Sequence, residues 1–386
     1  MVGVRSVTSR GGWVLGCVVL GLLEGCATGR PPAAPPGVAS EPSAEHLRAG
    51  CDGGEVAACA RLGSRHLLGE GVEKDAHLAA ALFGKGCDAG DGWACGALGS
   101  LYQEGEGVEK DARRATALFG DACAGGVAQG CDSLGVNLLT GRGVEKDERR
   151  AVELFFQACD AGYPPACYRL GALFAKGQGV AQDKRRASAL YEQACGAGLA
   201  SACASLGNLH VQGQGVERDE RRAATLYEKA CQGGAASGCG GLGFLHEEGR
   251  GVKKDERRAA TLFEKACNGG DAPACTALGR LSLEGRGVEK DARRAAAAYA
   301  KGCEQEDFNA CTTLGILHQD AIGMERDERR AAALYGQACD HGVPEACSFL
   351  GTLYREGRGV EKDERRAAAL YEQACQGGVS RYCQSP

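Results

Sequence analysis

The chain has 386 residues, of which 44% are apolar, and its 50 acidic and 45 basic residues give a net charge of −5. This composition excludes a disordered chain, which combines few apolar residues with a high net charge, and a dedicated nucleic-acid binder, which carries a basic excess. The 22 cysteines and 61 glycines are the unusual numbers, and such a cysteine content is typical of proteins in an oxidising compartment outside the cytosol.

The N-terminal segment has the layout of an export signal. Arg5 and Arg10 lie in the first ten residues, and the uncharged segment 11–23 that follows is too short to span a bilayer. The segment closes with Leu23, Glu24, Gly25 and Cys26, which resembles the lipobox of bacterial lipoproteins, although Glu24 departs from the small or apolar residue usual there. Residues 1–25 are therefore predicted to be a lipoprotein signal peptide, and this resemblance implies that Cys26 carries the lipid.

Two alternatives for this segment stay open. An ordinary signal peptidase that cleaves near Ala27 would release a soluble exported protein instead. If the lipid is attached, the absence of aspartate at position 27 favours the outer membrane over the inner membrane. Residues 26–44 are rich in proline and are expected to form an extended tether, because they cannot pack a core; the prolines are Pro31, Pro32, Pro35, Pro36 and Pro42.

The rest of the chain repeats with a period of 36 residues. One cysteine series runs from Cys51 to Cys375 at this interval, and a second series runs from Cys59 to Cys383, always eight residues behind the first. Supersecondary units stacked into a solenoid produce such a strict period, whereas separate globular domains do not.

Each unit contains two amphipathic helices, as residues 343–378 illustrate. Apolar residues recur with helical spacing in both halves of the unit, and paired glycines between the halves can supply the positive φ that ends a helix. Asp363 then stands where it can cap the second helix. A Phe or Tyr eight residues after each capping aspartate, an Ala four residues after it and a glycine in the middle of each first helix complete the unit, and the mid-helix glycine predicts a close helix contact.

These motifs resemble the Sel1-like repeat, a relative of the tetratricopeptide repeat, and the cysteines resemble the secreted cysteine-rich branch of that family. The resemblance covers nine full repeats at residues 55–378, with a half-repeat on each side, within one predicted domain at 45–386. It implies an all-α fold, a right-handed α/α superhelical solenoid. Two repeats depart from the pattern: Ala321 replaces a loop glycine in repeat eight, where a strained or altered turn is expected, and His77 and Leu78 replace the paired arginines in repeat one.

The cysteine pairs are expected to form disulfides, because a short turn between antiparallel helices brings their first facing positions within disulfide reach. Metal binding and redox catalysis are the alternatives, but C-x2-C pairs are absent and few histidines accompany the cysteines. The predicted pairs are Cys51 with Cys59, Cys87 with Cys95, Cys123 with Cys131, Cys159 with Cys167, Cys195 with Cys203, Cys231 with Cys239, Cys267 with Cys275, Cys303 with Cys311, Cys339 with Cys347 and Cys375 with Cys383.

The sequence predicts no catalytic residue, metal site or cofactor, because none of the common nucleophile, phosphate-binding, metal-binding or dinucleotide motifs is present. One position of the repeat holds histidine in four repeats and Tyr or Phe in several others; the histidines are His66, His210, His246 and His318. We call this position the histidine column, and its mixture of aromatic residues favours packing over metal binding. The paired arginines favour an exposed row of ion pairs over a site for anionic lipid or glycan. Some cysteine-rich members of the family are described as β-lactam-binding proteins or weak β-lactamases, and this resemblance implies the alternative function.

If the resemblance holds, the first helices line the concave surface, where the variable residues are expected to lie. Mixed apolar, amide and basic groups there suit an extended peptide or a loop of a partner protein, although unselected variation of exposed positions would look the same. The candidate groove residues are Tyr168, Arg169, Asn208, Phe244, Arg280 and Phe349. The sequence thus predicts a non-catalytic scaffold that binds a protein or peptide in the cell envelope, reaches the membrane through its lipid and binds no nucleic acid. Its predicted location is the outer membrane, the periplasm or the extracellular space.

Overall fold

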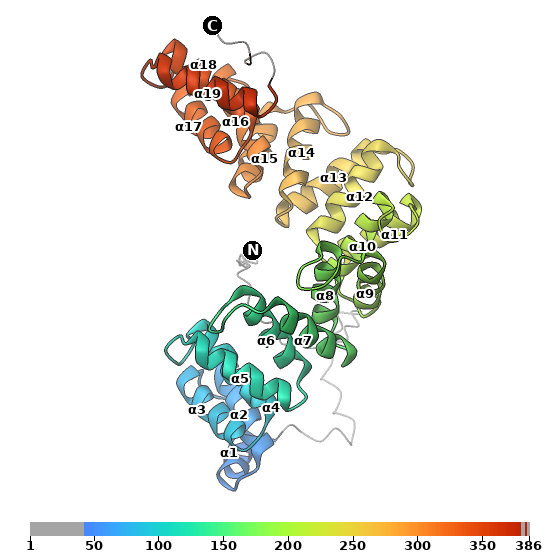
Figure 1. The fold of residues 1–386 in the computed structure, drawn as a ribbon, viewed down its shortest axis with the longest axis vertical. Helices are drawn as coiled ribbons and strands as arrows, with labels where there is room; N and C mark the ends of the chain where they lie inside the picture. The colour runs from blue at the N-terminus through green and yellow to red at the C-terminus, as the bar shows by residue number, and fades with distance from the viewer. Residues whose placement is uncertain (1–41, 380–382, 384–386) are drawn as a thin grey trace, which may run out of the picture. The chain divides into compact units, whose positions relative to one another are not determined.

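The computed structural model describes residues 42–379 and 383, so the predicted signal, Cys26 and most of the predicted tether lie outside the described residues. The described part contains nineteen α-helices and no strand (Figure 1). The helices are α1 (Ala44–Asp52), α2 (Val56–Leu68), α3 (Ala76–Asp88), α4 (Gly92–Glu104), α5 (Ala112–Ala124), α6 (Ala128–Thr140), α7 (Glu148–Asp160), α8 (Pro164–Lys176), α9 (Lys184–Gly196), α10 (Ala200–Gln212), α11 (Glu220–Gln232), α12 (Ala236–Glu248), α13 (Glu256–Asn268), α14 (Ala272–Glu284), α15 (Ala292–Glu304), α16 (Phe308–Asp320), α17 (Glu328–Asp340), α18 (Pro344–Glu356) and α19 (Glu364–Gln376).

The predicted solenoid of paired helices is confirmed. Each helix from α1 to α19 packs against the next one along the chain, and contacts also reach the helix two positions on, as between α10 and α12. The even-numbered helices α2 to α18 are the first helices of the nine repeats, and the odd-numbered helices α3 to α19 are the second helices. Among residues 42–379, no helix has the length and hydropathy needed to span a membrane.

The helix ends lie where capping residues place them. The predicted aspartate precedes every second helix and accepts a hydrogen bond from an amide in the first turn, as Asp255 does from Arg258 at 2.9 Å. The first helices end at a residue with left-handed backbone, such as Gly249 at φ 73°, whose amide donates to a carbonyl four residues earlier. These caps satisfy backbone groups that helix ends leave unpaired.

The core of each repeat is an aromatic ring set against a glycine. Phe155 and Ala151 of the second helix α7 are 0% exposed. The ring of Phe155 lies so close to Gly135 of the first helix α6 that a Cβ on this glycine would be 2.9 Å from the ring. The close contact predicted for the mid-helix glycine is therefore a contact with the aromatic side chain of its own repeat.

All ten predicted disulfides are present, with Cα atoms 4.5 to 4.8 Å apart. The first of them joins α1 to α2, and the next eight each join a second helix to the first helix of the following repeat. The tenth joins α19 to Cys383, which lies outside the helices.

Candidate partner-binding face

The six candidate residues lie on five first helices, α8, α10, α12, α14 and α18. Asn208 is exposed and the other five are half-buried. We call these six residues the first-helix face. Each makes a specific contact within the solenoid, so the surface that it offers is held in a fixed orientation.

The three aromatic residues of this face pack on aromatic residues of second helices. Phe244 meets Phe263 edge to face, with ring centroids 4.7 Å apart. Tyr168 and Tyr191 are 5.6 Å apart, and Phe349 and Tyr335 are 5.2 Å apart. Each half-buried ring is therefore the outer member of an aromatic pair whose inner member fills the core.

Arg169 forms an ion pair with a buried carboxylate on the preceding first helix. Its Nη1 donates to both carboxylate oxygens of Asp132, at 3.0 and 3.1 Å. The Asp132 side chain is 4% exposed and that of Arg169 is 40% exposed. Burial raises the pKa of Asp132 to about 6, although Arg169 acts in the opposite direction.

Arg280 forms a similar ion pair three repeats further along the chain, with an acid at a different position of the preceding first helix. It donates to Glu247, whose side chain is 7% exposed and whose other nearby cation is Arg286 at 3.3 Å. The arginine side chain is 39% exposed. Both arginines of the face thus neutralise a buried acid and still present part of the guanidinium to solvent.

The sixth residue, Asn208, accepts a hydrogen bond from the hydroxyl of Tyr227 in its own repeat. Burial raises the pKa of Tyr227 to about 12, so its hydroxyl is neutral and donates at ordinary pH. The contact fixes the orientation of the exposed amide.

The prediction of this face missed Asp132 and Glu247. Asp132 stands 37 residues before Arg169, and Glu247 stands 33 residues before Arg280, both close to one repeat length. A search for acids about one repeat before each arginine would have found them. Part of the residue variation at the repeat positions that form the first-helix face therefore comes from contacts between successive first helices.

The paired arginines form an incomplete row of ion pairs on the second helices. Arg222, Arg258 and Arg294 each pair with a glutamate thirty residues earlier, at 3.1 to 3.3 Å. In three repeats where that position is not glutamate, the arginine lies instead over an aromatic ring of its own first helix, as Arg114 does over Tyr102 at 5.5 Å.

The histidine column supports the loop that follows each first helix. Nδ1 of His66, His210 and His246 lies 3.2 Å from a backbone carbonyl seven residues further on, to which it donates. Among the described residues no group of three or more His, Cys, Asp or Glu could hold a metal ion. The packing interpretation of this column accounts for what these three side chains contact.

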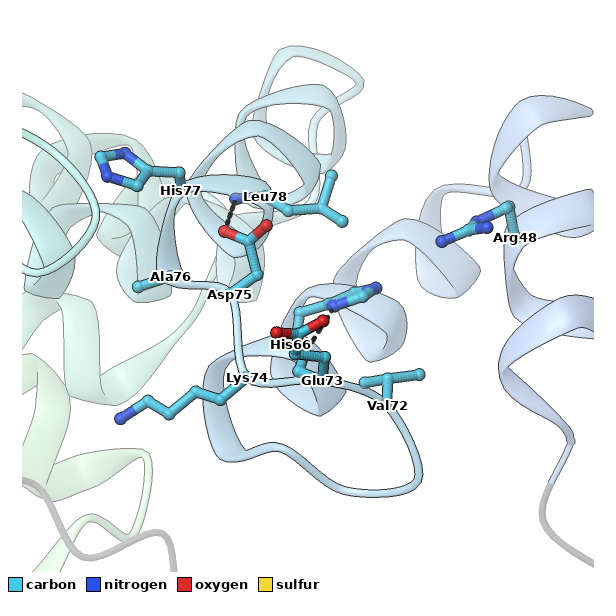
Figure 2. A pocket seen from close by; sticks show the side chains of 9 residues that line it. All are labelled: Arg48, His66, Val72, Glu73, Lys74, Asp75, Ala76, His77 and Leu78. Carbon is cyan, nitrogen blue, oxygen red and sulfur yellow. Dashed lines mark hydrogen bonds between the residues drawn. The ribbon is translucent and has the colours of Figure 1, made fainter.

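The first repeat has a hollow of about 660 Å³ that reflects its different neighbours. In Figure 2, Arg48 of α1 lies apart from the other lining residues, which come from α2, the loop after it and the start of α3. Arg48 and Leu78 of this hollow stand where Glu192 and Arg222 form an ion pair in a later repeat. An arginine at position 78 would stand opposite Arg48, which accounts for Leu78; nothing in the structure explains His77.

Comparison with solved structures finds the same architecture in two bacterial proteins, and a third is similar in sequence to part of the chain. The chain is 28% identical to c5321, a protective antigen with an SLR fold from uropathogenic Escherichia coli, with a TM-score of 0.67 over 88% of this chain and 72% of that chain. A Sel1 repeat protein from Oxalobacter formigenes is 26% identical, with a TM-score of 0.60 over 80% of this chain and 89% of that one. Helicobacter pylori cysteine rich protein B is 31% identical over 34% of this chain and 95% of its own length, with a TM-score of 0.28.

No curated protein sequence matches the chain. The model of the Sel1 repeat matches nine successive segments, at residues 56–91, 94–127, 128–163, 164–199, 200–234, 236–271, 272–307, 309–343 and 344–379. These segments coincide with the nine pairs of first and second helices, and the chain therefore belongs to the Sel1 repeat family.

Proposed function

We propose that the protein is a non-catalytic scaffold of the cell envelope that binds a protein or peptide on its first-helix face. The observation that favours this is the chemistry of the face. Aromatic rings and arginines are the residues that dominate the energy of protein interfaces, and here they are half-buried and oriented before a partner arrives. Fixing them in advance lowers the entropy cost of binding.

The envelope location rests on three observations. Ten disulfides require an oxidising compartment to form and persist. The N-terminal sequence resembles a lipoprotein signal, with Cys26 as the lipid attachment site. The similar protein c5321 is a protective antigen present in uropathogenic Escherichia coli strains.

The binding experiment is capture of a partner from an envelope extract by the purified protein. The variants Phe244→Ala and Arg280→Gln remove one aromatic and one cationic group of the face. Glu247 keeps Arg286 at 3.3 Å in the second variant, so the buried acid is not left alone. We expect each variant to retain roughly a tenth or less of the captured partner, since a residue at the centre of an interface contributes 2 kcal/mol or more.

Matched control variants lie on second helices. Phe156→Ala removes an aromatic side chain that is 60% exposed, and Arg222→Gln removes an arginine that also pairs with a glutamate. Both controls should capture the partner as wild type does. Equal capture by the wild type, Phe244→Ala and Arg280→Gln proteins would refute binding on the first-helix face.

The lipid anchor has its own test. In cells that express the Cys26→Ser variant, the protein should move from the membrane fraction to the soluble fraction. It should also no longer incorporate a labelled fatty-acid analogue. Retention of the label would show that Cys26 is not the attachment site. No observation on the described residues favours the alternative of β-lactam binding or hydrolysis, and we do not propose it.

A further inference from the structure

The ten disulfides differ in how far solvent reaches their sulfur atoms. In nine of them the second cysteine lies in a first helix and is at most 4% exposed, as with Cys59 at 4%, Cys203 at 1% and Cys347 at 1%. In the tenth disulfide, Cys383 is exposed and its partner Cys375 is half-buried. Cys87 is half-buried as Cys375 is, so exposure of the second cysteine is what separates the tenth disulfide from the other nine.

Exposure of this disulfide is not a general property of chain ends. The disulfide nearest the other end joins Cys51 to Cys59, and these two residues are 6% and 4% exposed. Leu47 and Leu62 cover this pair in a buried apolar cluster, since α1 and α2 pack against each other.

Thiol–disulfide exchange requires a thiolate to reach a sulfur atom, and its rate also depends on the thiol that leaves. The leaving cysteine is equivalent in all ten pairs, because Cys375 and its nine counterparts all lie in or just before the last turn of a helix that ends a repeat. Access is therefore the factor that differs. Exchange at a buried pair must wait for local unfolding, which lowers its rate by the equilibrium constant for opening.

We propose that the Cys375–Cys383 disulfide is a thiol–disulfide exchange site, at which an external thiol forms a mixed disulfide with Cys383. The thiolate R–S⁻ attacks Sγ of Cys383, the Cys383–Cys375 bond breaks, and the R–S–S–Cys383 bond forms. Cys375 leaves as a thiolate and takes a proton from water. Attack by a second thiol on the mixed disulfide releases R–S–S–R and the Cys383 thiol, which completes a two-electron reduction supplied by the two external thiols.

The first experiment follows all ten disulfides in the folded full-length protein. Reduced glutathione, or thioredoxin in a parallel arm, is added for increasing times, free thiols are alkylated, and each cysteine is quantified by peptide mass spectrometry. Cys375 and Cys383 should react at least about 100-fold faster than Cys51 and Cys59, in line with local opening of a packed helix pair. The arm that reacts shows whether small thiols or protein thiols use the site, and failure of both arms would overturn the proposal.

Urea separates access from unfolding. Below the unfolding transition, rising urea should speed the reaction of the eight pairs in which both cysteines are buried and leave the rate at Cys375–Cys383 nearly unchanged, because only the buried pairs need to open. A rate at Cys375–Cys383 that rises with urea as steeply as the rate at Cys51–Cys59 would show that its reaction also depends on unfolding. That result would overturn the proposal.

A variant pair provides a second readout. Cys375→Ser leaves Cys383 as a free, exposed thiol, which should form a mixed disulfide with oxidised glutathione and add one glutathione in the intact mass. Cys51→Ser leaves Cys59 free but buried and should add none while circular dichroism shows native helix content. Equal adducts on the two folded variants would contradict a role for exposure.

Discussion

Two residues hold the left-handed backbone conformation without being glycine. Glu306 has φ 66° and Ala321 has φ 58°, and they stand immediately before and after the segment Asp307–Asp320 that contains α16. Glycine occupies the equivalent place in other repeats, as Gly357 does with φ 68°. A side chain in this conformation costs about 1 to 2 kcal/mol, so repeat eight carries strain at both ends of its first helix.

Replacing these residues with glycine should stabilise the protein. Ala321→Gly and Glu306→Gly should each raise the free energy of opening α16 by about 1 kcal/mol, since relief of strain exceeds the added entropy of the unfolded chain. Hydrogen exchange of α16 amides measures this opening directly. Gly357→Ala is the reverse change in repeat nine and should weaken α18 by a similar amount; a stabilising effect of that substitution would refute the strain argument.

The buried ion pair of Asp132 with Arg169 predicts a pH dependence of stability. Burial raises the pKa of Asp132 to about 6, above its ordinary value of 3.8, so between these values the folded state binds the proton more tightly than the unfolded state. Stability contributed by this group is fully present below pH 3.8 and is lost as pH rises through about 6. At higher pH the folded protein must hold a charged carboxylate that is almost out of contact with water.

Asp132→Asn keeps an oxygen that can accept from Arg169 and removes the titration. The variant should gain stability relative to wild type as pH rises from about 4 to 7, by up to about 3 kcal/mol for a shift of this size. Urea unfolding at several pH values measures the difference. Asp160→Asn, at an exposed aspartate, should follow the wild-type profile, and a constant difference for Asp132→Asn across this range would argue against the raised pKa.

At the scale of the helix, glycines occupy two environments within the same repeat. Gly99 lies in the middle of the first helix α4, and a Cβ there would be 2.9 Å from the ring of Phe119. Gly120 lies in the second helix α5 and has no atom within 4 Å of its Cβ position. Helix propensity favours alanine at both, so only the packing distinguishes them.

Alanine at these two glycines should therefore have opposite effects. Gly120→Ala should stabilise the protein by about 0.5 to 1 kcal/mol through helix propensity. Gly99→Ala should destabilise it by about 1 to 3 kcal/mol, because the methyl group displaces the Phe119 ring from a close-packed core. Thermal or urea unfolding of the two variants beside wild type decides the matter, and stabilisation by both would mean that the ring does not need the space.

The helices and disulfides were predictable from the sequence because each depends on residues that lie close together along the chain. The capping aspartates, the aromatic residue and the cysteine pair recur every 36 residues, so the sequence shows the same local pattern in nine successive repeats. The contacts of individual arginines were not predictable in this way. Arg222 pairs with Glu192, thirty residues earlier in the preceding repeat. The residue thirty positions before Arg114 is Gly84, which offers no carboxylate, and Arg114 lies over Tyr102 instead. Such pairings depend on residues that differ from one repeat to the next.

For the whole solenoid, one contact between neighbouring repeats lies in the loop after the first helix, in the repeats that follow the first. The second glycine of this loop lies against the first turn of the preceding second helix, so that a Cβ on Gly251 would overlap the carbonyl of Glu220. Arg250 beside it donates to the Glu220 carboxylate at 2.8 and 3.0 Å. Stability of a repeat array depends on such interfaces between neighbours, because each repeat contacts only those beside it.

A substitution in this loop should divide the cooperative unfolding of the solenoid into two transitions. In Gly251→Ala the methyl group cannot be accommodated without separating the loop from α11, which removes this contact and weakens the interface between the fifth and sixth repeats. We expect the single unfolding transition to split into two, with the helices on the two sides of this loop exchanging amide hydrogens at different urea concentrations.

Gly71→Ala is the matched control for this prediction. Gly71 has φ 71° and Gly251 has φ 67°, so alanine meets the same backbone strain at both. In the described part of the chain, however, no atom lies within 4 Å of a Cβ on Gly71. Gly71→Ala should lower stability by about 1 to 2 kcal/mol without dividing the transition. If Gly251→Ala also leaves one cooperative transition and no greater loss, strain rather than the interface between repeats accounts for the glycine.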